Sequence, residues 1–96
     1  PVLVVLSVET IKEAIKIAND SKYGLAAAIW TNDYDEAYQV SRLLESGIVH
    51  INSYGEDDNM VPFGGVKESG LGVDKSIYAF DEYSNQKTIW MSFKSL

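Results

Sequence analysis

The sequence predicts an α/β fold with a parallel sheet, in the element order β-α-β-α-β. Two stretches with helical periodicity are each followed by a glycine, Gly24 or Gly47, and then by a short apolar run. Such runs, alternating with helices, are typical of parallel strands that are covered on both faces. Because parallel neighbours need a crossover connection, the helical stretches also supply the links that this sheet requires.

The first unit opens with residues 1–6, an apolar run that is expected to form a strand. Ser7, followed by Thr10, is expected to begin a helix and to accept a hydrogen bond from a free backbone N–H. The apolar face of this helix recurs at i, i+3, i+4 and i+7 and comprises Ile11, Ala14, Ile15 and Ala18. Gly24 is expected to close the helix in a left-handed conformation, before a strand over 25–31.

The second unit repeats this plan. Asp33 and Glu36 form a capping-box pattern, which predicts that a helix begins directly after Asp33. The inner face of this helix is predicted to comprise Ala37, Val40 and Leu44. Gly47 is then expected to close the helix, and residues 48–51 to form the next strand.

The remaining chain departs from the pattern. Residues 53–73 predict a long loop, and the sequence PFGG at 62–65 favours an ordered one. Asp74 is expected to cap a short helix that runs to about Tyr83. Residues 87–93 predict a final apolar strand, which needs a partner strand from elsewhere.

Composition excludes several classes of function. The formal net charge is −6 and only 8 residues are Lys or Arg, which argues against nucleic-acid binding. No run of about 18 apolar residues is long enough to span a membrane, and no signal-peptide pattern is present, so we expect a soluble cytoplasmic protein. The chain has no cysteine and a single histidine, His50, which excludes a cysteine nucleophile and a multi-histidine metal site within it.

Several motifs together resemble the C-terminal stretch of the NAD(P)-dependent aldehyde dehydrogenase superfamily. The strongest is PFGGVKESG at 62–70, which matches the family pattern PFGG-x-K-x-SG in order and spacing. Supporting matches are AND at 18–20, YGLAA at 23–27, WT at 30–31, GIV at 47–49, IN at 51–52 and KTIW at 87–90. The resemblance covers essentially all 96 residues, and DKS at 74–76 with the TIW ending is most similar to γ-glutamyl-γ-aminobutyraldehyde dehydrogenases.

The resemblance implies an enzyme in which a cysteine thiolate attacks an aldehyde, hydride passes to NAD or NADP, and a glutamate-activated water releases the carboxylic acid. It places that cysteine, that glutamate and the dinucleotide-binding region before residue 1, so this chain alone is expected to be inactive and to bind no cofactor. Residues 1–83 would form the C-terminal part of the catalytic (thiol) domain. Residues 84–96 would form an oligomerisation strand and tail of a homodimer or homotetramer.

The resemblance also implies roles for individual residues. Phe63 corresponds to an aromatic that lines the aldehyde pocket, and Ser53, Gly55 and Asp57 fall where the family varies its substrate contacts. Residues expected to hold the pocket loop in shape are Asn52, Pro62, Gly64 and Gly65. No catalytic, cofactor-binding or metal-binding residue is expected.

Other charged and glycine-rich features have simpler interpretations. The acidic run at 56–58 could attract a cationic aldehyde, although a solvated loop tip is the preferred interpretation. The glycines of the 64–72 stretch match no complete phosphate-binding motif and are expected to serve a tight loop with positive φ. Lys67 is expected to fix that loop or a subunit contact, and His50 to act as a packing residue.

Two further hypotheses remain open at this point. The chain could be a stand-alone interaction module that pairs with another protein through its terminal strand. It could also come from a CoA-acylating or semialdehyde-specific member of the same superfamily, since the residues that would distinguish these enzymes lie before residue 1.

Overall fold

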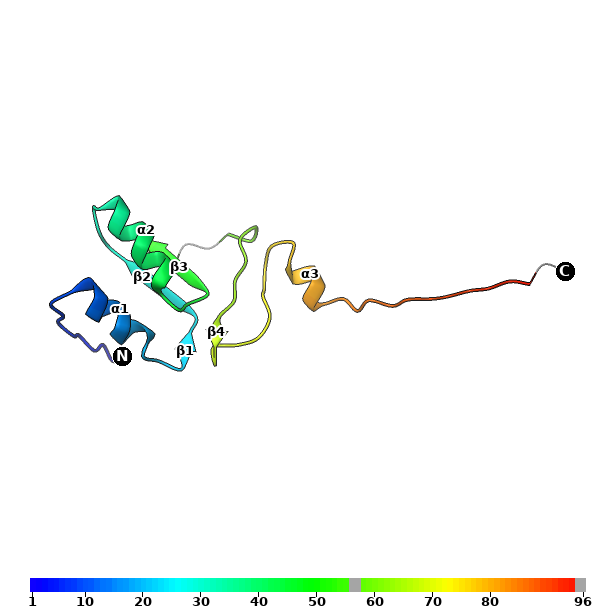
Figure 1. The fold of residues 1–96 in the computed structure, drawn as a ribbon, viewed down its shortest axis with the longest axis horizontal. Coiled ribbons are helices and arrows are strands. Elements are labelled where there is room, and N and C mark those ends of the chain that lie inside the picture. The colour runs from blue at the N-terminus through cyan, green and yellow to red at the C-terminus, as the bar shows by residue number, and fades with distance from the viewer. Residues whose placement is uncertain (56–57, 95–96) are drawn as a thin grey trace.

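The computed structural model describes residues 1–55 and 58–94, and its centre is a β-α-β unit. Strand β2 (Ala26–Ile29) and strand β3 (Ile48–Ile51) are parallel, with Ala26 opposite Ile48 and Ile29 opposite Ile51. Helix α2 (Tyr34–Leu43) links the two strands and packs against both of them, and helix α1 (Ile11–Asn19) packs against α2 (Figure 1). The predicted parallel pairing and the two helices are therefore confirmed.

Three short elements complete the fold. Strand β1 (Tyr23–Gly24) pairs antiparallel with β4 (Val66–Lys67), and this pairing brings the PFGG loop back to the end of α1. Helix α3 (Ala79–Glu82) is one turn long. It is shorter than predicted and Asp74 does not cap it, because the backbone of Asp74 instead pairs with that of Phe63.

Both longer helices begin with a capped first turn. Asp33 Oδ1 accepts a hydrogen bond from the Glu36 N–H at 3.0 Å, which confirms the predicted start of α2. The prediction for α1 was wrong in its capping residue. Thr10, not Ser7, is the N-cap: its Oγ1 accepts from the Glu13 N–H at 3.1 Å, because it directly precedes the first helical residue.

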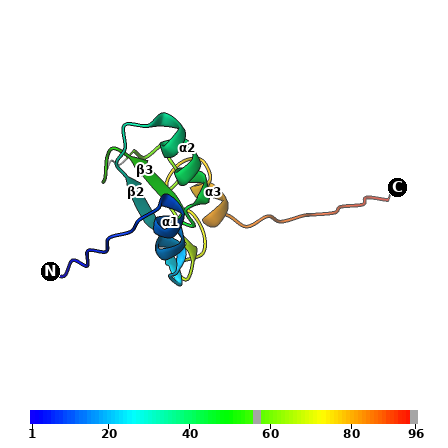
Figure 2. The same cartoon turned by 60° about the vertical axis from the view of Figure 1, so that its left-hand side comes forward.

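The two ends of the chain differ from the prediction. Residues 1–6 and 87–93 form no strand, and the C-terminal stretch runs away from the rest of the molecule (Figure 2). Their apolar side chains are almost fully exposed, with Val2 at 94% and Trp90 at 92%. A strand needs a neighbour to satisfy its backbone groups, and no described segment lies beside either stretch to provide one.

The described chain buries little apolar surface. Its accessible surface of 8877 Å² exceeds the value of about 5,500 Å² expected for a compact protein of 10.7 kDa. The radius of gyration is 20.3 Å, against about 12.5 Å for a compact chain of this length. Ala37, on the inner face of α2, is the one buried hydrophobic residue among those described. No helix in the described ranges is long and apolar enough to cross a membrane.

Gly24 and Gly47 do not adopt the left-handed conformation that the sequence predicted. The glycines with positive φ are Gly55, Gly70 and Gly72. A Cβ on Gly24 would overlap the Glu45 carbonyl oxygen, and a Cβ on Gly47 would overlap that of Gly64. Both residues are therefore glycine because another backbone approaches closely, and not because of a helix-closing turn.

Candidate functional site

An open groove of about 1020 Å³ lies between the first residues of β2 and β3 and the loop that follows β3. Its volume is at the upper end of the range of about 300–1,000 Å³ that is common for small-molecule pockets. The groove is mainly apolar, with a few charged groups at one side. Its lining residues are Leu25, Ala26, Ile48, Val49, His50, Tyr54, Gly55, Asp58, Val61, Pro62, Phe63, Asp74 and Lys75.

Phe63 enters this groove from a fixed stretch of backbone. Its N–H donates to the Asp74 carbonyl at 2.8 Å, and its own carbonyl accepts from the Asp74 N–H at 2.7 Å. The Lys75 ammonium lies 5.3 Å from the centre of the Phe63 ring, within the range of a cation–π interaction. The ring keeps 41% of its side-chain surface exposed, so it presents an apolar face to the groove.

The two glycines after Phe63 are enclosed by other backbone segments. A Cβ on Gly64 would lie 2.8 Å from the Gly72 carbonyl oxygen, and a Cβ on Gly65 would lie 2.6 Å from Ser69 Cβ. Neither glycine has a positive φ, so the expected φ-positive role was wrong for these two, whereas Gly70 and Gly72, with φ of 147° and 82°, confirm it. Their lack of a side chain lets the loop pack closely against its neighbours and holds Phe63 in place.

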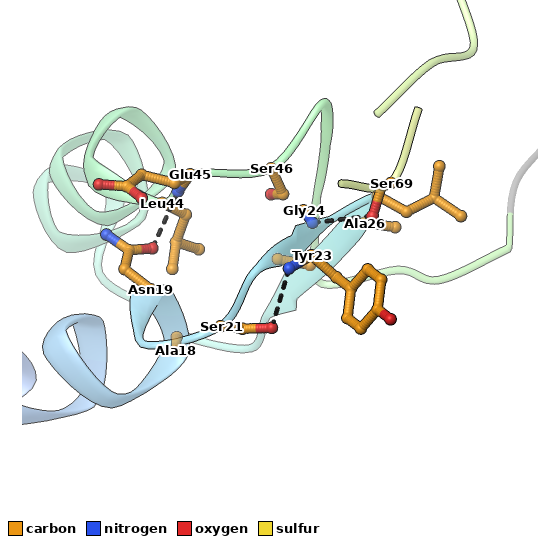
Figure 3. Close-up of a pocket in the computed structure, with 12 residues that line it drawn as sticks. Ala18, Asn19, Ser21, Tyr23, Gly24, Ala26, Leu44, Glu45, Ser46 and Ser69 are labelled. Atoms are coloured by element: carbon orange, nitrogen blue, oxygen red, sulfur yellow. Dashed lines mark hydrogen bonds between the residues drawn. The ribbon is translucent and has the colours of Figure 1, made fainter. Parts of the chain in front are cut away.

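A smaller hollow of about 330 Å³ lies on the other side of this loop, between the ends of α1 and α2 (Figure 3). Here the Gly24 N–H donates to Ser69 Oγ at 2.9 Å. Asn19 donates from Nδ2 to the Leu43 carbonyl at 2.8 Å and accepts at Oδ1 from the Glu45 N–H at 2.9 Å. This polar cluster joins the loop to both helices.

The structure places the other predicted site residues as follows. Asn52 adopts a φ of 55° and binds the backbone of Thr31 twice, donating to its carbonyl and accepting from its N–H, both at 2.9 Å. It therefore ties the end of β3 to the end of β2, not to the PFGG loop. Gly55 and the exposed Pro62 line the groove, whereas Ser53 does not. Asp57, with Glu56, lies outside the described residues.

Sequence reasoning missed four groove or anchor residues. His50 on β3 and Tyr54 stack obliquely, with ring centres 5.6 Å apart, and both line the groove beside Lys75. Tyr54 and Lys75 lie in irregular segments, where no periodic signal indicates which way a side chain points. Asn19 was expected only to end a helix. Its place in the AND motif at 18–20 was the one feature of the sequence that could have indicated its anchoring role.

The glycine-rich stretch packs closely against other parts of the chain, because a Cβ on Gly64 or Gly65 would overlap neighbouring atoms. Among residues 1–55 and 58–94 no cluster of His, Cys, Asp or Glu is arranged to hold a metal ion. The described residues around Phe63 line a mainly apolar groove of a shape suited to a pocket wall.

Comparison with known proteins agrees with this picture. The profile of the aldehyde dehydrogenase family matches residues 1–89. The NADP/NAD-dependent aldehyde dehydrogenase PuuC of Escherichia coli is 47% identical over 95 residues, which is 99% of this chain and 19% of the length of PuuC. The chain thus spans about a fifth of that curated relative.

Two solved structures give the same result. Indole-3-acetaldehyde dehydrogenase of P. syringae, in complex with NAD+ and IAA, is 48% identical with a TM-score of 0.82, over 92% of this chain and 18% of that one. γ-Glutamyl-γ-aminobutyraldehyde dehydrogenase of Burkholderia cenocepacia is 49% identical with a TM-score of 0.76, over 78% of this chain and 15% of that one. Enzymes named for quite different aldehydes are thus about equally similar.

Proposed function

The chain belongs to the aldehyde dehydrogenase family, and we propose that it forms part of a longer enzyme that oxidises an aldehyde to a carboxylic acid with NAD+ or NADP+. In that enzyme residues 1–83 form the end of the catalytic domain, and residues 84–96 form a subunit contact in a homodimer or homotetramer. Residues 95–96 of this tail lie outside the described residues.

The observation that carries the proposal is the groove that contains Phe63. Its apolar ring is held by paired backbone hydrogen bonds and by closely packed glycines, so its position is fixed before a substrate arrives. A rigid aromatic wall buries the apolar part of an aldehyde and excludes water from the reacting carbon. Pocket wall is the role that these residues fit best.

The chemistry itself is supplied by residues outside this chain. The 96 residues contain no cysteine, so the thiol nucleophile comes from elsewhere in the polypeptide. The family resemblance places the dinucleotide-binding region before residue 1, so NAD+ or NADP+ would be held by other residues too. When bound, that cofactor accepts the hydride.

The exposed tail supports the subunit contact. Four large apolar side chains lie along it and are mostly exposed: Ile89, Trp90, Met91 and Phe93. A stretch of this kind, without a neighbouring strand, is suited to extend a sheet of a second subunit. The same strand pairing was the basis of the interaction-module hypothesis. In the proposed enzyme it would serve the assembly of subunits.

The direct test is an assay of the full-length protein with a panel of aldehydes. We expect aldehyde-dependent reduction of NAD+ or NADP+ and release of a free carboxylic acid. Formation of an acyl-CoA only when CoA is supplied would establish the CoA-acylating alternative instead. Absence of turnover with every aldehyde and both cofactors would contradict the proposal.

A substitution tests the role of Phe63 in the same assay. Loss of a ring contact of about 1.5–3 kcal/mol corresponds to a rise of about 10- to 100-fold in KM for an aromatic aldehyde, so we expect such a rise in Phe63→Ala. Tyr34→Ala is the matched control, because Tyr34 is an exposed aromatic at the start of α2, outside the groove. Equal KM values for the aldehyde in Phe63→Ala and Tyr34→Ala would contradict a role of Phe63 in the aldehyde pocket.

A further inference from the structure

The Lys67 ammonium has three oxygen partners in the described part of the chain. Its Nζ donates to the carbonyls of Asn19 at 2.8 Å and Ser21 at 3.0 Å, and it lies 2.6 Å from Glu45 Oε2. We propose that Lys67 is a positioning residue of the aldehyde pocket, which fixes the loop that carries Phe63 to the ends of α1 and α2. This inference rests on the proposed function and assigns a role within the same site.

The surroundings match a primary ammonium group. An ammonium has three N–H donors, and here each has an oxygen acceptor, while the side chain is only 25% exposed. Two of the acceptors, the carbonyls of Asn19 and Ser21, lie at the C-terminal end of α1, where helix carbonyls lack partners and the helix dipole is negative. The third is a carboxylate, which strengthens the interaction.

The same contacts join three segments into one closed polar network. Asn19, whose carbonyl accepts from Lys67, donates from its side chain to the Leu43 carbonyl. Its side-chain oxygen accepts from the Glu45 N–H after α2, as Figure 3 shows. Glu45 returns to Lys67 through its carboxylate. Displacing Lys67 therefore disturbs the junction of α1, the end of α2 and the PFGG loop at once.

Lys67 is also placed to act on Phe63 through the backbone. It lies in β4, four residues after Phe63, and β4 pairs with β1 directly after the end of α1. The residues between are closely packed, since Gly64 abuts Gly47 and Gly72, and Gly65 abuts Ser69. A shift of Lys67 would therefore be passed to Phe63 along a short and tightly packed stretch.

The experiment uses the full-length enzyme with Lys67→Met, which keeps an unbranched side chain of similar length and removes the donors. Losing charge-assisted hydrogen bonds of this kind predicts a rise of about 10-fold or more in KM for an aromatic aldehyde, with KM for NAD+ or NADP+ changed less than about twofold. Lys67→Arg should recover part of the loss, because it keeps the charge.

Lys22→Met is the matched control. Lys22 is another lysine at the same junction, but its pair with Glu68 has a distance of 3.3 Å and both side chains are mostly exposed. Exposed pairs contribute little, so we expect less than a twofold change in any kinetic constant. Equal effects of Lys67→Met and Lys22→Met would overturn the inference.

A double variant distinguishes positioning from general destabilisation. If Lys67 acts through Phe63, Lys67→Met combined with Phe63→Ala should have the same aldehyde KM as Phe63→Ala alone. Multiplying effects, or a parallel rise in KM for the cofactor, would show a general structural role and overturn the inference. If Lys67→Met does not fold, Glu45→Gln tests the same network with a milder change and must show the same pattern, reduced in size.

The outcomes separate the two proposals. If the wild type is active and Lys67→Met does not change the KM for the aldehyde, only the positioning role is contradicted, and the proposed function stands. A wild type without activity on any aldehyde contradicts both.

Discussion

The PFGG loop and the two ends of the chain are both irregular, yet they differ sharply in how they are held. The loop at 62–69 is fixed by close glycine contacts, by the Ser69 hydroxyl and by the Lys67 ammonium, all within the described residues. Residues 1–8 and 84–94 carry many apolar side chains and adopt no helix or strand. The loop finds its packing contacts and hydrogen-bond partners within the described chain. The apolar side chains of the two ends would need a second surface to cover them.

This difference indicates how the chain is used. The loop is preorganised and can define one wall of a pocket. In the proposed longer enzyme, other parts of the protein would supply neighbouring strands and apolar cover for the two ends. Three substitutions, in order of decreasing expected effect, test whether the two regions differ in this way.

The largest effect is expected from Val4→Asp. In the full-length protein residues 1–6 would be a covered strand, and a buried, unpaired carboxylate costs roughly 3–5 kcal/mol. We expect most soluble, active protein to be lost, whereas Val4→Ile should be tolerated. In the isolated 96-residue chain Val4 is 74% exposed, so Val4→Asp should change nothing in circular dichroism or in the radius of gyration. A fully active Val4→Asp enzyme would show that this end stays uncovered.

A smaller effect is expected from Gly47→Ala, which challenges the close packing of the loop. The new Cβ would overlap the Gly64 carbonyl oxygen, and overpacking of this kind costs about 1–3 kcal/mol. Thermal unfolding and the aldehyde KM of the full-length enzyme measure it. For thermal unfolding Gly55→Asn is the control, since a Cβ there meets no atom within 4 Å and Asn tolerates a positive φ. Equal losses in both variants would mean that the close contact is unimportant.

The smallest effect of the three is expected from Ser69→Ala. It removes the hydroxyl oxygen that accepts from the Gly24 N–H, and one hydrogen bond of this kind contributes about 0.5–1.5 kcal/mol. Hydrogen exchange at the Gly24 amide should become faster, with a modest fall in the unfolding midpoint. Ser41→Ala, at a half-buried serine whose hydroxyl donates only to the Tyr38 carbonyl within α2, should stay within about 0.5 kcal/mol of the wild type. Unchanged exchange at Gly24 would contradict the anchoring role of Ser69.

Local sequence signals predicted the central unit well. The spacing of Ala37 and Val40, the Asp33 cap and the apolar run at 48–51 indicated α2 and β3 nearly to the residue, since periodicity and capping depend on neighbours in the chain. The same reasoning failed at residues 1–6, because an apolar run indicates a strand only where a partner exists. It also assigned Gly24 and Gly47 to helix ends, because sequence does not show which distant backbone approaches a glycine.

The candidate site was predictable only in part. The resemblance carried by the PFGG pattern implied Phe63 as a wall residue, and Phe63 lines the groove of about 1020 Å³. Tyr54 and Lys75 were not foreseen, because they lie in irregular segments that have no periodicity. The anchor formed by Asn19, the last residue of α1, was not foreseen because its partners follow α2, more than twenty residues away. The family resemblance pointed to a site without revealing these contacts.

The sequence by itself determined the helices, the parallel β-α-β order and membership of the aldehyde dehydrogenase family, because these follow from periodicity, capping and motif spacing along one chain. Only the tertiary structure decided why residues 24, 47, 64 and 65 are glycine and what the Lys67 ammonium binds. For residues 24, 47 and 67 those answers depend on segments 17 to 48 residues apart meeting within a few ångströms, which is a property of packing and not of local sequence.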